Sequence, residues 1–163
     1  MESDVAIAPR KPLTDAESVE HLAKARSMVR YYTAWSAGAG VVPIPVVDTV
    51  LVMGVQVQML RKLAHHYGLA FNEELATKLV SVLLGGVLPS LVSGGVGSLF
   101  KMVPGVGTLL NVVTMPAFSA AATYAVGRVF TEHFDLGGTL LSFDPEKVRG
   151  YFNELYKSGA PAN

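Results

Sequence analysis

The stretch LVSVLLGGVLPSLVSGGVGSLFKMVPGVGTLLNVVTMPAFSAAATYAVG covers residues 79–127 and contains one charged residue, Lys101. An α-helix needs about 20 predominantly apolar residues to cross the hydrocarbon layer of a membrane. The segments Leu79–Phe100 and Met102–Gly127 both reach that length, and only Lys101 separates them. We therefore expect an apolar helical hairpin over residues 79–127, with Lys101 near its tip, where its amine can reach lipid head groups.

Small residues recur at helical spacing within this hairpin. Stripes of small residues let two helix backbones approach closely, which is how helices associate where lipid removes the hydrophobic driving force. The predicted helix-packing positions are every fourth residue in each segment, namely Gly86, Ser90, Gly94 and Ser98 in the first and Ala117, Ala121 and Ala125 in the second.

The apolar segments also have a second interpretation. They also occur as central helices of a soluble bundle, which lack charge because they are buried on every side. A chain of 163 residues has few other helices to surround them, but oligomerisation would supply the missing cover. The alternative to an inserted hairpin is thus a soluble helical homo-oligomer that buries these helices or binds a hydrophobic ligand.

The rest of the chain predicts more helices and an all-α fold of about five. Residues 1–12 contain Pro9 and Pro12 without periodicity and are expected to form a flexible arm before a single helical domain, residues 13–163. Thr14 and Glu17 have the spacing of a capping box at the start of the first helix.

Later helix starts are marked as clearly. Pro45 suits the first turn of a second helix, which should stop at Gly68. Asn72 is the expected cap of a third helix, and Asp144 with Pro145 marks a short C-terminal helix.

Two breaks of similar sequence join the long helices. Val42-Pro43 and Val103-Pro104 each connect two helices, so we interpret the chain as two helix-Val-Pro-helix halves. The third helix is expected to run on into the uncharged stretch with a kink at Pro89, and the fourth to cover about Thr108 to Phe134. The predicted hinge residues are Pro43, Pro45, Pro104 and Gly105.

Composition narrows the possible functions. The chain has 13 Lys and Arg against 13 Asp and Glu, so no net field favours nucleic acid as a partner. It is 50% hydrophobic and 16% charged, whereas soluble domains are about 25% charged. It has no cysteine, which excludes disulfides and thiolate metal sites. Its N-terminus lacks the continuous apolar core of a secretory signal, so we expect an intracellular protein.

One acid lies inside an apolar stretch. Asp48 is the only charged residue between Thr33 and Leu60. A carboxylate in an apolar stretch is a candidate buried polar site, and an ion-handling or enzymatic role centred on Asp48 and the histidines is a further alternative. The structural interpretation is that Asp48 interacts with free amides in the first turn after Pro45.

No pattern of an enzyme or of a cofactor site is present. The adjacent His65 and His66 would diverge by about 100° on a helix, and Glu132-His133-Phe134-Asp135 lacks the HExxH spacing of a metal site. The glycine-rich residues 94–101 lack the GxxxxGK[ST] order of a phosphate loop. We expect no catalytic residue, no metal and no cofactor, and we interpret Trp35 and the six Met residues as packing or interface residues.

The order of short motifs resembles the bacterial domain-of-unknown-function family numbered six-nine-seven, over roughly Ala34 to Lys157. The motifs that carry the resemblance are Pro43-Ile44-Pro45 with Asp48, Gln58-Met59, Leu63-Ala64-His65-His66-Tyr67-Gly68, Val103-Pro104-Gly105 and Ala122-Thr123-Tyr124-Ala125-Val126-Gly127.

Members of this family occur alone or after small Era-like GTPase domains, often with membrane segments. The resemblance implies association with the cytoplasmic side of the inner membrane and a possible GTPase partner, and it supplies no catalytic residues. Together with the apolar hairpin, it leads us to expect a membrane-associated helical interaction or scaffolding protein that binds membrane lipid and forms a homo-oligomer.

Overall fold

A computed structural model describes residues 14–39, 45–86 and 106–159. Within these ranges the side chains of Ala39, of residues 45–50 and of residues 106–115 are not described. Several predictions lie outside the described residues: the arm 1–12, the tip Lys101, the hinges Pro43, Pro104 and Gly105, and the packing positions Ser90, Gly94 and Ser98.

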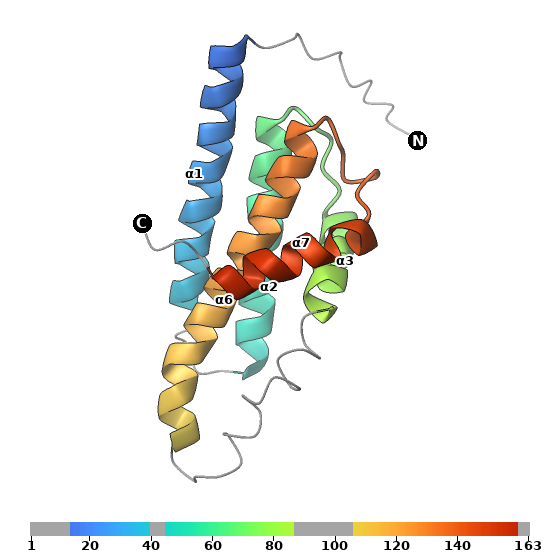
Figure 1. Ribbon diagram of the computed structural model, residues 1–163. Coiled ribbons are helices and arrows are strands. Elements are labelled where there is room, and N and C mark those ends of the chain that lie inside the picture. Colours follow the sequence, from blue (N-terminus) through green and yellow to red (C-terminus); the bar gives the residue numbers. More distant parts are fainter. Residues whose placement is uncertain (1–13, 40–44, 87–105, 160–163) are drawn as a thin grey trace.

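The fold is all-α, as predicted, and the described residues form five helices and no strand. The helices are α1 (Asp15–Ala39), α2 (Pro45–His66), α3 (Glu73–Gly85), α6 (Val106–Asp135) and α7 (Pro145–Ser158). The first four run alternately down and up the molecule, and α7 crosses them (Figure 1).

Three predicted helix starts are confirmed by their hydrogen bonds. The backbone N–H of Thr14 donates to Glu17 at 2.8 Å, and the N–H of Glu17 donates back to the Thr14 hydroxyl at 3.4 Å, which completes the capping box. Asn72 accepts from the N–H of Leu75 at 2.8 Å. Asp144 accepts from the N–H of Glu146 at 3.1 Å, with Pro145 as the first helical residue.

The predicted stop of α2 at Gly68 is also confirmed. Gly68 adopts φ +64°, which glycine reaches without steric cost. The N–H groups of Gly68 and Leu69 donate to the carbonyls of His65 and Ala64 at 3.0 and 2.8 Å, so the last helical carbonyls are satisfied as in a Schellman motif.

The third helix is shorter than expected. It ends at Gly85, so the prediction that it runs on without a break into the uncharged stretch is wrong, and the kink predicted at Pro89 lies outside the described residues. Two consecutive glycines, Gly85 and Gly86, explain the early stop because glycine is among the least favourable residues for a helix. The fourth predicted helix is α6, which begins at Val106 and continues through Pro116.

The core lies where α1, α2 and α6 meet. Its fully buried side chains include Val29, Met59, Leu63, Val126, Phe130 and Phe134. The ring of Phe130 stacks on Phe143 with centroids 4.1 Å apart, which holds the segment between α6 and α7 against the bundle. Helix α7 adds Phe152, which is also fully buried.

Candidate functional site

Charged residues separate along the axis of the bundle. Because α1 and α3 run opposite to α2 and α6, the C-terminal ends of the first two lie at the same end of the molecule as the N-terminal ends of the others (Figure 1). We call the segments at this end the uncharged end: residues 33–39, 45–60, 79–85 and 106–127. Asp48 is their only charged residue. The opposite, charged end carries the remaining charges of these four helices.

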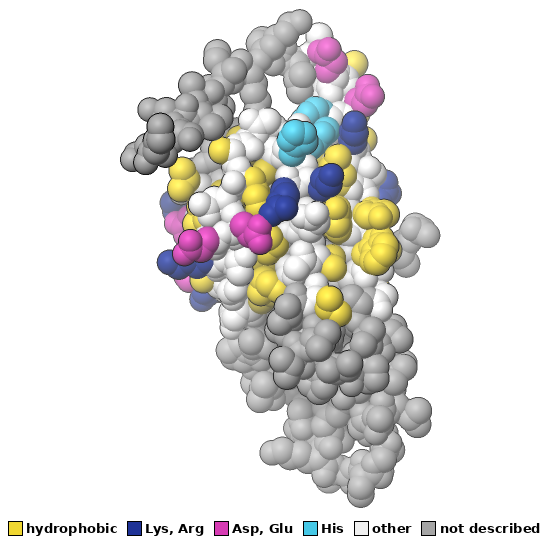
Figure 2. All heavy atoms as spheres, turned by 180° about the vertical axis from the view of Figure 1, so that it is seen from behind, with side chains coloured by type: hydrophobic (Ala, Val, Ile, Leu, Met, Phe, Trp, Pro, Cys, Tyr) yellow, Lys and Arg dark blue, Asp and Glu magenta, His cyan; other side chains and the backbone are white. Residues whose placement is uncertain are grey.

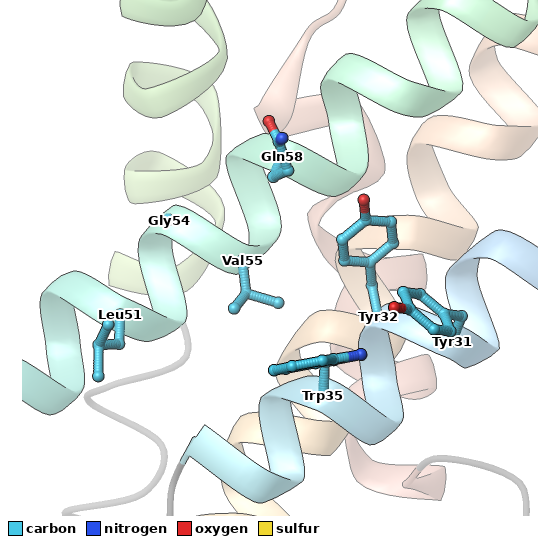
Figure 3. Close-up of a pocket in the computed structure, with 7 residues that line it drawn as sticks. All are labelled: Tyr31, Tyr32, Trp35, Leu51, Gly54, Val55 and Gln58. Carbon is cyan, nitrogen blue, oxygen red and sulfur yellow. The ribbon is translucent and has the colours of Figure 1, made fainter.

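An open aromatic groove lies between α1 and α2. Its lining residues are Tyr31, Tyr32 and Trp35 from α1 and Leu51, Gly54, Val55 and Gln58 from α2. Its volume is about 460 Å³. Figure 3 shows Val55 pointing toward the indole of Trp35, while the Gln58 amide points away from the groove.

Three large hydrophobic side chains of the groove are exposed. Trp35 is 60% exposed, Tyr31 58% and Leu51 42%. The ring of Tyr31 lies 5.3 Å from that of Tyr32, edge to face, and 6.4 Å from that of Trp35. Burial, with a smaller contribution from Tyr31, raises the pKa of Tyr32 above its ordinary value.

The groove continues in both directions along the helices. Toward the charged end, Tyr31 and Tyr32 also line a hollow of about 340 Å³ with Ser27, Met28 and Lys62. Toward the uncharged end, Trp35 and Tyr31 line a third hollow of about 690 Å³, completed by Ala34, Gly38, Leu51 and Val55. On the face seen in Figure 2, hydrophobic side chains gather below a group of Lys, Arg and His side chains.

Behind the groove, buried hydrogen bonds connect α1 and α2 to α6. Thr123 of α6 donates to Ser36 Oγ at 2.8 Å, and Ser36 in turn donates to the carbonyl of Ser119 at 3.1 Å. The Gln56 amide of α2 donates to Thr123 at 3.3 Å. All four side chains are buried. Polar bonds of this kind between helices fix their rotation, so the α1 and α2 faces that line the groove are set by α6.

The histidines lie toward the charged end. His21 and His66 stack with ring centroids 3.8 Å apart, and His66 Nε2 lies 3.0 Å from the carbonyl of His21. His133 Nε2 lies 2.9 Å from the Thr139 carbonyl and 3.3 Å from the Ser142 hydroxyl, which ties down the segment after α6. Among the described residues, no group of three or more His, Asp and Glu side chains could hold a metal ion.

The predicted site residues are scattered over the described fold. Asp48 lies in the first turns of α2, which begins at Pro45. Gly86 caps α3, and a Cβ there would lie 3.2 Å from Arg149 Nε. Ala121 and Ala125 are buried on α6, whereas Ala117 is exposed.

A neighbouring stripe of small residues on α6 faces α1. Ser119, Thr123 and Gly127 lie on α6 toward α1, and a Cβ on Gly127 would lie 2.6 Å from Val29 Cγ1. The stripe thus packs against α1 in the described part of the chain.

The aromatic groove was not predicted as a site. The sequence holds one signal, the spacing of Tyr31, Tyr32 and Trp35, which places aromatic rings on one side of a helix. That spacing does not tell whether the rings are buried by another helix or left open, so Trp35 was interpreted only as a packing or interface residue.

Comparison with known proteins adds the family. Residues 16–156 match the family described as "Domain of unknown function (DUF697)". The chain belongs to this family. The predicted family membership is thereby confirmed, over a longer range than the motifs that suggested it.

One relative of this DUF697 chain is a protein whose name refers to the magnetosome membrane. The chain is 34% identical over 136 residues to "Magnetosome membrane protein 22" of Magnetospirillum gryphiswaldense, an alignment that covers 83% of this chain and 70% of that protein. No solved structure matches the chain. In the part of the chain that the structure describes, no helix is both long enough and apolar enough to cross a membrane.

Proposed function

We propose that this DUF697 protein is a membrane-associated helical module without enzymatic activity. It contacts the lipid bilayer through its uncharged end, where the apolar hairpin predicted over residues 79–127 has its tip, and it presents its charged end to a partner. The observation that carries this proposal is that four helix segments with Asp48 as their only charged residue lie together at one end of the bundle.

The position of the exposed aromatic residues supports the same orientation. Trp and Tyr prefer the interface between lipid and water, where an apolar ring and a polar group are both satisfied. Trp35 and Tyr31 lie on α1 between its charged first half and its uncharged last turns. With the uncharged end in the bilayer, these rings reach the head-group level while the charges of the opposite end stay in water.

The relative named for the magnetosome membrane supports membrane association as well. The position on the cytoplasmic side of the inner membrane, the homo-oligomer and the GTPase partner stay predictions that rest on the sequence and the family resemblance. We propose no nucleic acid partner, since the chain carries no net charge.

Membrane fractionation tests this function directly. Cells that express the full chain are lysed, and the membranes are washed with high salt and then with carbonate. Salt removes proteins held by charge alone, and carbonate removes peripheral proteins, so retention through both washes is the expected result for an inserted uncharged end.

Recovery in the soluble fraction would overturn the proposal. It would favour the alternative of a soluble homo-oligomer that buries its apolar helices, which size-exclusion chromatography with light scattering would then detect. Complete release by salt would limit the contact to surface charge and would contradict insertion.

A further inference from the structure

The three hollows between α1 and α2 form one amphipathic groove, which runs from Ser27 and Lys62 past Tyr31 to Trp35 and Gly38. We propose that this groove binds one anionic phospholipid of the bilayer, with the phosphate at Lys62 and an acyl chain along Trp35. This inference rests on the proposed function, since it names the lipid class that the membrane-facing module takes from the bilayer.

The polar end of the groove suits an anion. Lys62 is exposed and makes no ion pair with a described residue. Lys24 lies one turn before Ser27 and Met28 on the same side of α1, and it also has no described ion pair.

The charge of the two lining segments has one sign. Residues 21–39 of α1 and 49–66 of α2 contain no Asp or Glu. Of their charged residues, Lys24 and Lys62 lie on the groove side, whereas Arg26 and Arg30 lie on the opposite flank of α1, since successive helical residues are about 100° apart. Only Arg61 is neutralised in the described structure, by Glu73 of α3. Lys62 and Lys24, which form no described ion pair, can therefore attract an anionic lipid head group at the membrane surface.

The other end of the groove suits an acyl chain. It is lined by Ala34, Trp35, Gly38, Leu51 and Val55, none of which carries a charge. Gly54 contributes to the width, because nothing lies within 4 Å of where its Cβ would be. Covering exposed apolar side chains with hydrocarbon removes them from water, which lowers the free energy of the system.

The direction of the groove agrees with the orientation of a lipid in a bilayer. Lys62 lies in the last turns of α2, toward the charged end, while Leu51 lies nearer the start of α2, toward the uncharged end. With the uncharged end in the membrane, a phospholipid can enter with its phosphate at Lys62 and its acyl chain pointing into the bilayer, without turning over.

Trp35 is the single tryptophan of the chain and lies inside the groove, so its fluorescence reports on the bound lipid. The full chain is mixed with vesicles of phosphatidylcholine that contain a minor fraction of phosphatidylglycerol. In one preparation the phosphatidylglycerol carries brominated acyl chains, which quench tryptophan, and in the other an equal amount of phosphatidylcholine carries them. Both preparations have the same surface charge.

We expect brominated phosphatidylglycerol to quench Trp35 more strongly, with a preference for the anionic lipid of about fivefold from one close lysine. Lys62→Gln should abolish this preference, and Gly54→Leu should reduce quenching by either lipid because its side chain fills the groove. Lys78→Gln is the matched control, since Lys78 is an exposed lysine of α3 outside the groove. Circular dichroism checks that each variant is folded.

Equal quenching by the two lipids while the protein floats with the vesicles would overturn the lipid site and leave the proposed function intact. Failure to float with either vesicle would overturn both. Inorganic phosphate alone is the competitor for the polar end. If phosphate shifts the Trp35 emission as strongly as the vesicles do, the groove binds a free anion, and the assignment to a phospholipid is wrong.

Discussion

Gly127 of α6 faces Val29 of α1 so closely that a Cβ on Gly127 would lie 2.6 Å from Val29 Cγ1 and 3.0 Å from the sulfur of Met59. Both neighbours are fully buried and cannot move into open space. The packing of α6 against α1 and α2 at this point therefore requires a residue without a side chain.

Replacing Gly127 by Ala should therefore destabilise the fold. Overpacking a closed core typically costs about 1–3 kcal/mol, which exceeds the gain from a better helix former. Urea denaturation measures the change. Gly54→Ala is the control, because the space around Gly54 is open and alanine should leave stability unchanged or raise it by up to about 1 kcal/mol. Equal effects of the two variants would contradict the close packing.

The Thr123 hydroxyl is expected to stabilise the helix bundle. Thr123→Val removes the partner of both Ser36 and Gln56 and should cost about 1–3 kcal/mol, since buried polar groups lose their hydrogen bonds. Thr77→Val serves as the control, because the Thr77 hydroxyl bonds only within its own helix, to the Glu73 carbonyl. If urea denaturation gives the same loss in the free energy of unfolding for both variants, the buried hydrogen bonds of Thr123 do not stabilise the bundle.

Trp35 should contribute to membrane binding and little to folding. Because the side chain is 60% exposed, Trp35→Ala is expected to change the free energy of unfolding by less than about 0.5 kcal/mol. Removing the indole from the lipid interface should weaken vesicle binding about tenfold, which corresponds to ~1.4 kcal/mol in the free energy of binding.

The control for Trp35 is Leu136→Ala. Leu136 is 89% exposed but follows α6 at the charged end of the bundle. Vesicle flotation of the two variants separates a specific surface from general hydrophobicity. An equal loss of binding in both would contradict the proposed orientation.

Stability should fall on mild acidification because of His66. Burial, with smaller contributions from the nearby charges of His21 and Lys24, lowers the pKa of His66, and its contact with the His21 carbonyl opposes this only in part. The unfolded chain, with a histidine pKa of about 6.5, therefore binds the proton more tightly than the folded one. The contribution of His66 is complete above that pH, declines below it, and is lost once the pH passes the lower folded pKa.

The midpoint of urea denaturation, measured from neutral pH to below the unfolded histidine pKa of about 6.5, tests this loss of stability. His66→Phe keeps an aromatic ring against His21 and should flatten the pH dependence. His65→Gln, one position away on an exposed part of α2, should not. An unchanged slope in His66→Phe would assign the acid sensitivity to another group.

Asp48→Asn distinguishes the structural interpretation of Asp48 from an ion-handling role. Asp48 lies near the N-terminus of α2, where a negative charge favours the helix dipole, so the substitution should lower stability by about 0.3–1 kcal/mol and leave vesicle binding unchanged. Unchanged stability together with a lost pH dependence of vesicle binding would instead support the ion-handling alternative.

Local signals in the sequence predicted most helix ends. The capping residues Thr14, Asn72 and Asp144 and the stop at Gly68 act through atoms within a few positions, so their effect can be seen without knowing the fold. The end of α3 at Gly85 was missed, because the apolar residues beyond it masked the weak helix preference of two consecutive glycines.

The all-α class, the helix starts and the separation of charged from uncharged segments could be predicted from residue type and from spacing along the chain. Only the tertiary structure decided that the stripe with Gly127 packs against Val29 of α1, and that Tyr31 and Trp35 stay open beside Leu51. Helical periodicity tells which residues share a face, but the partner of that face depends on the shapes of distant side chains, which no local pattern contains.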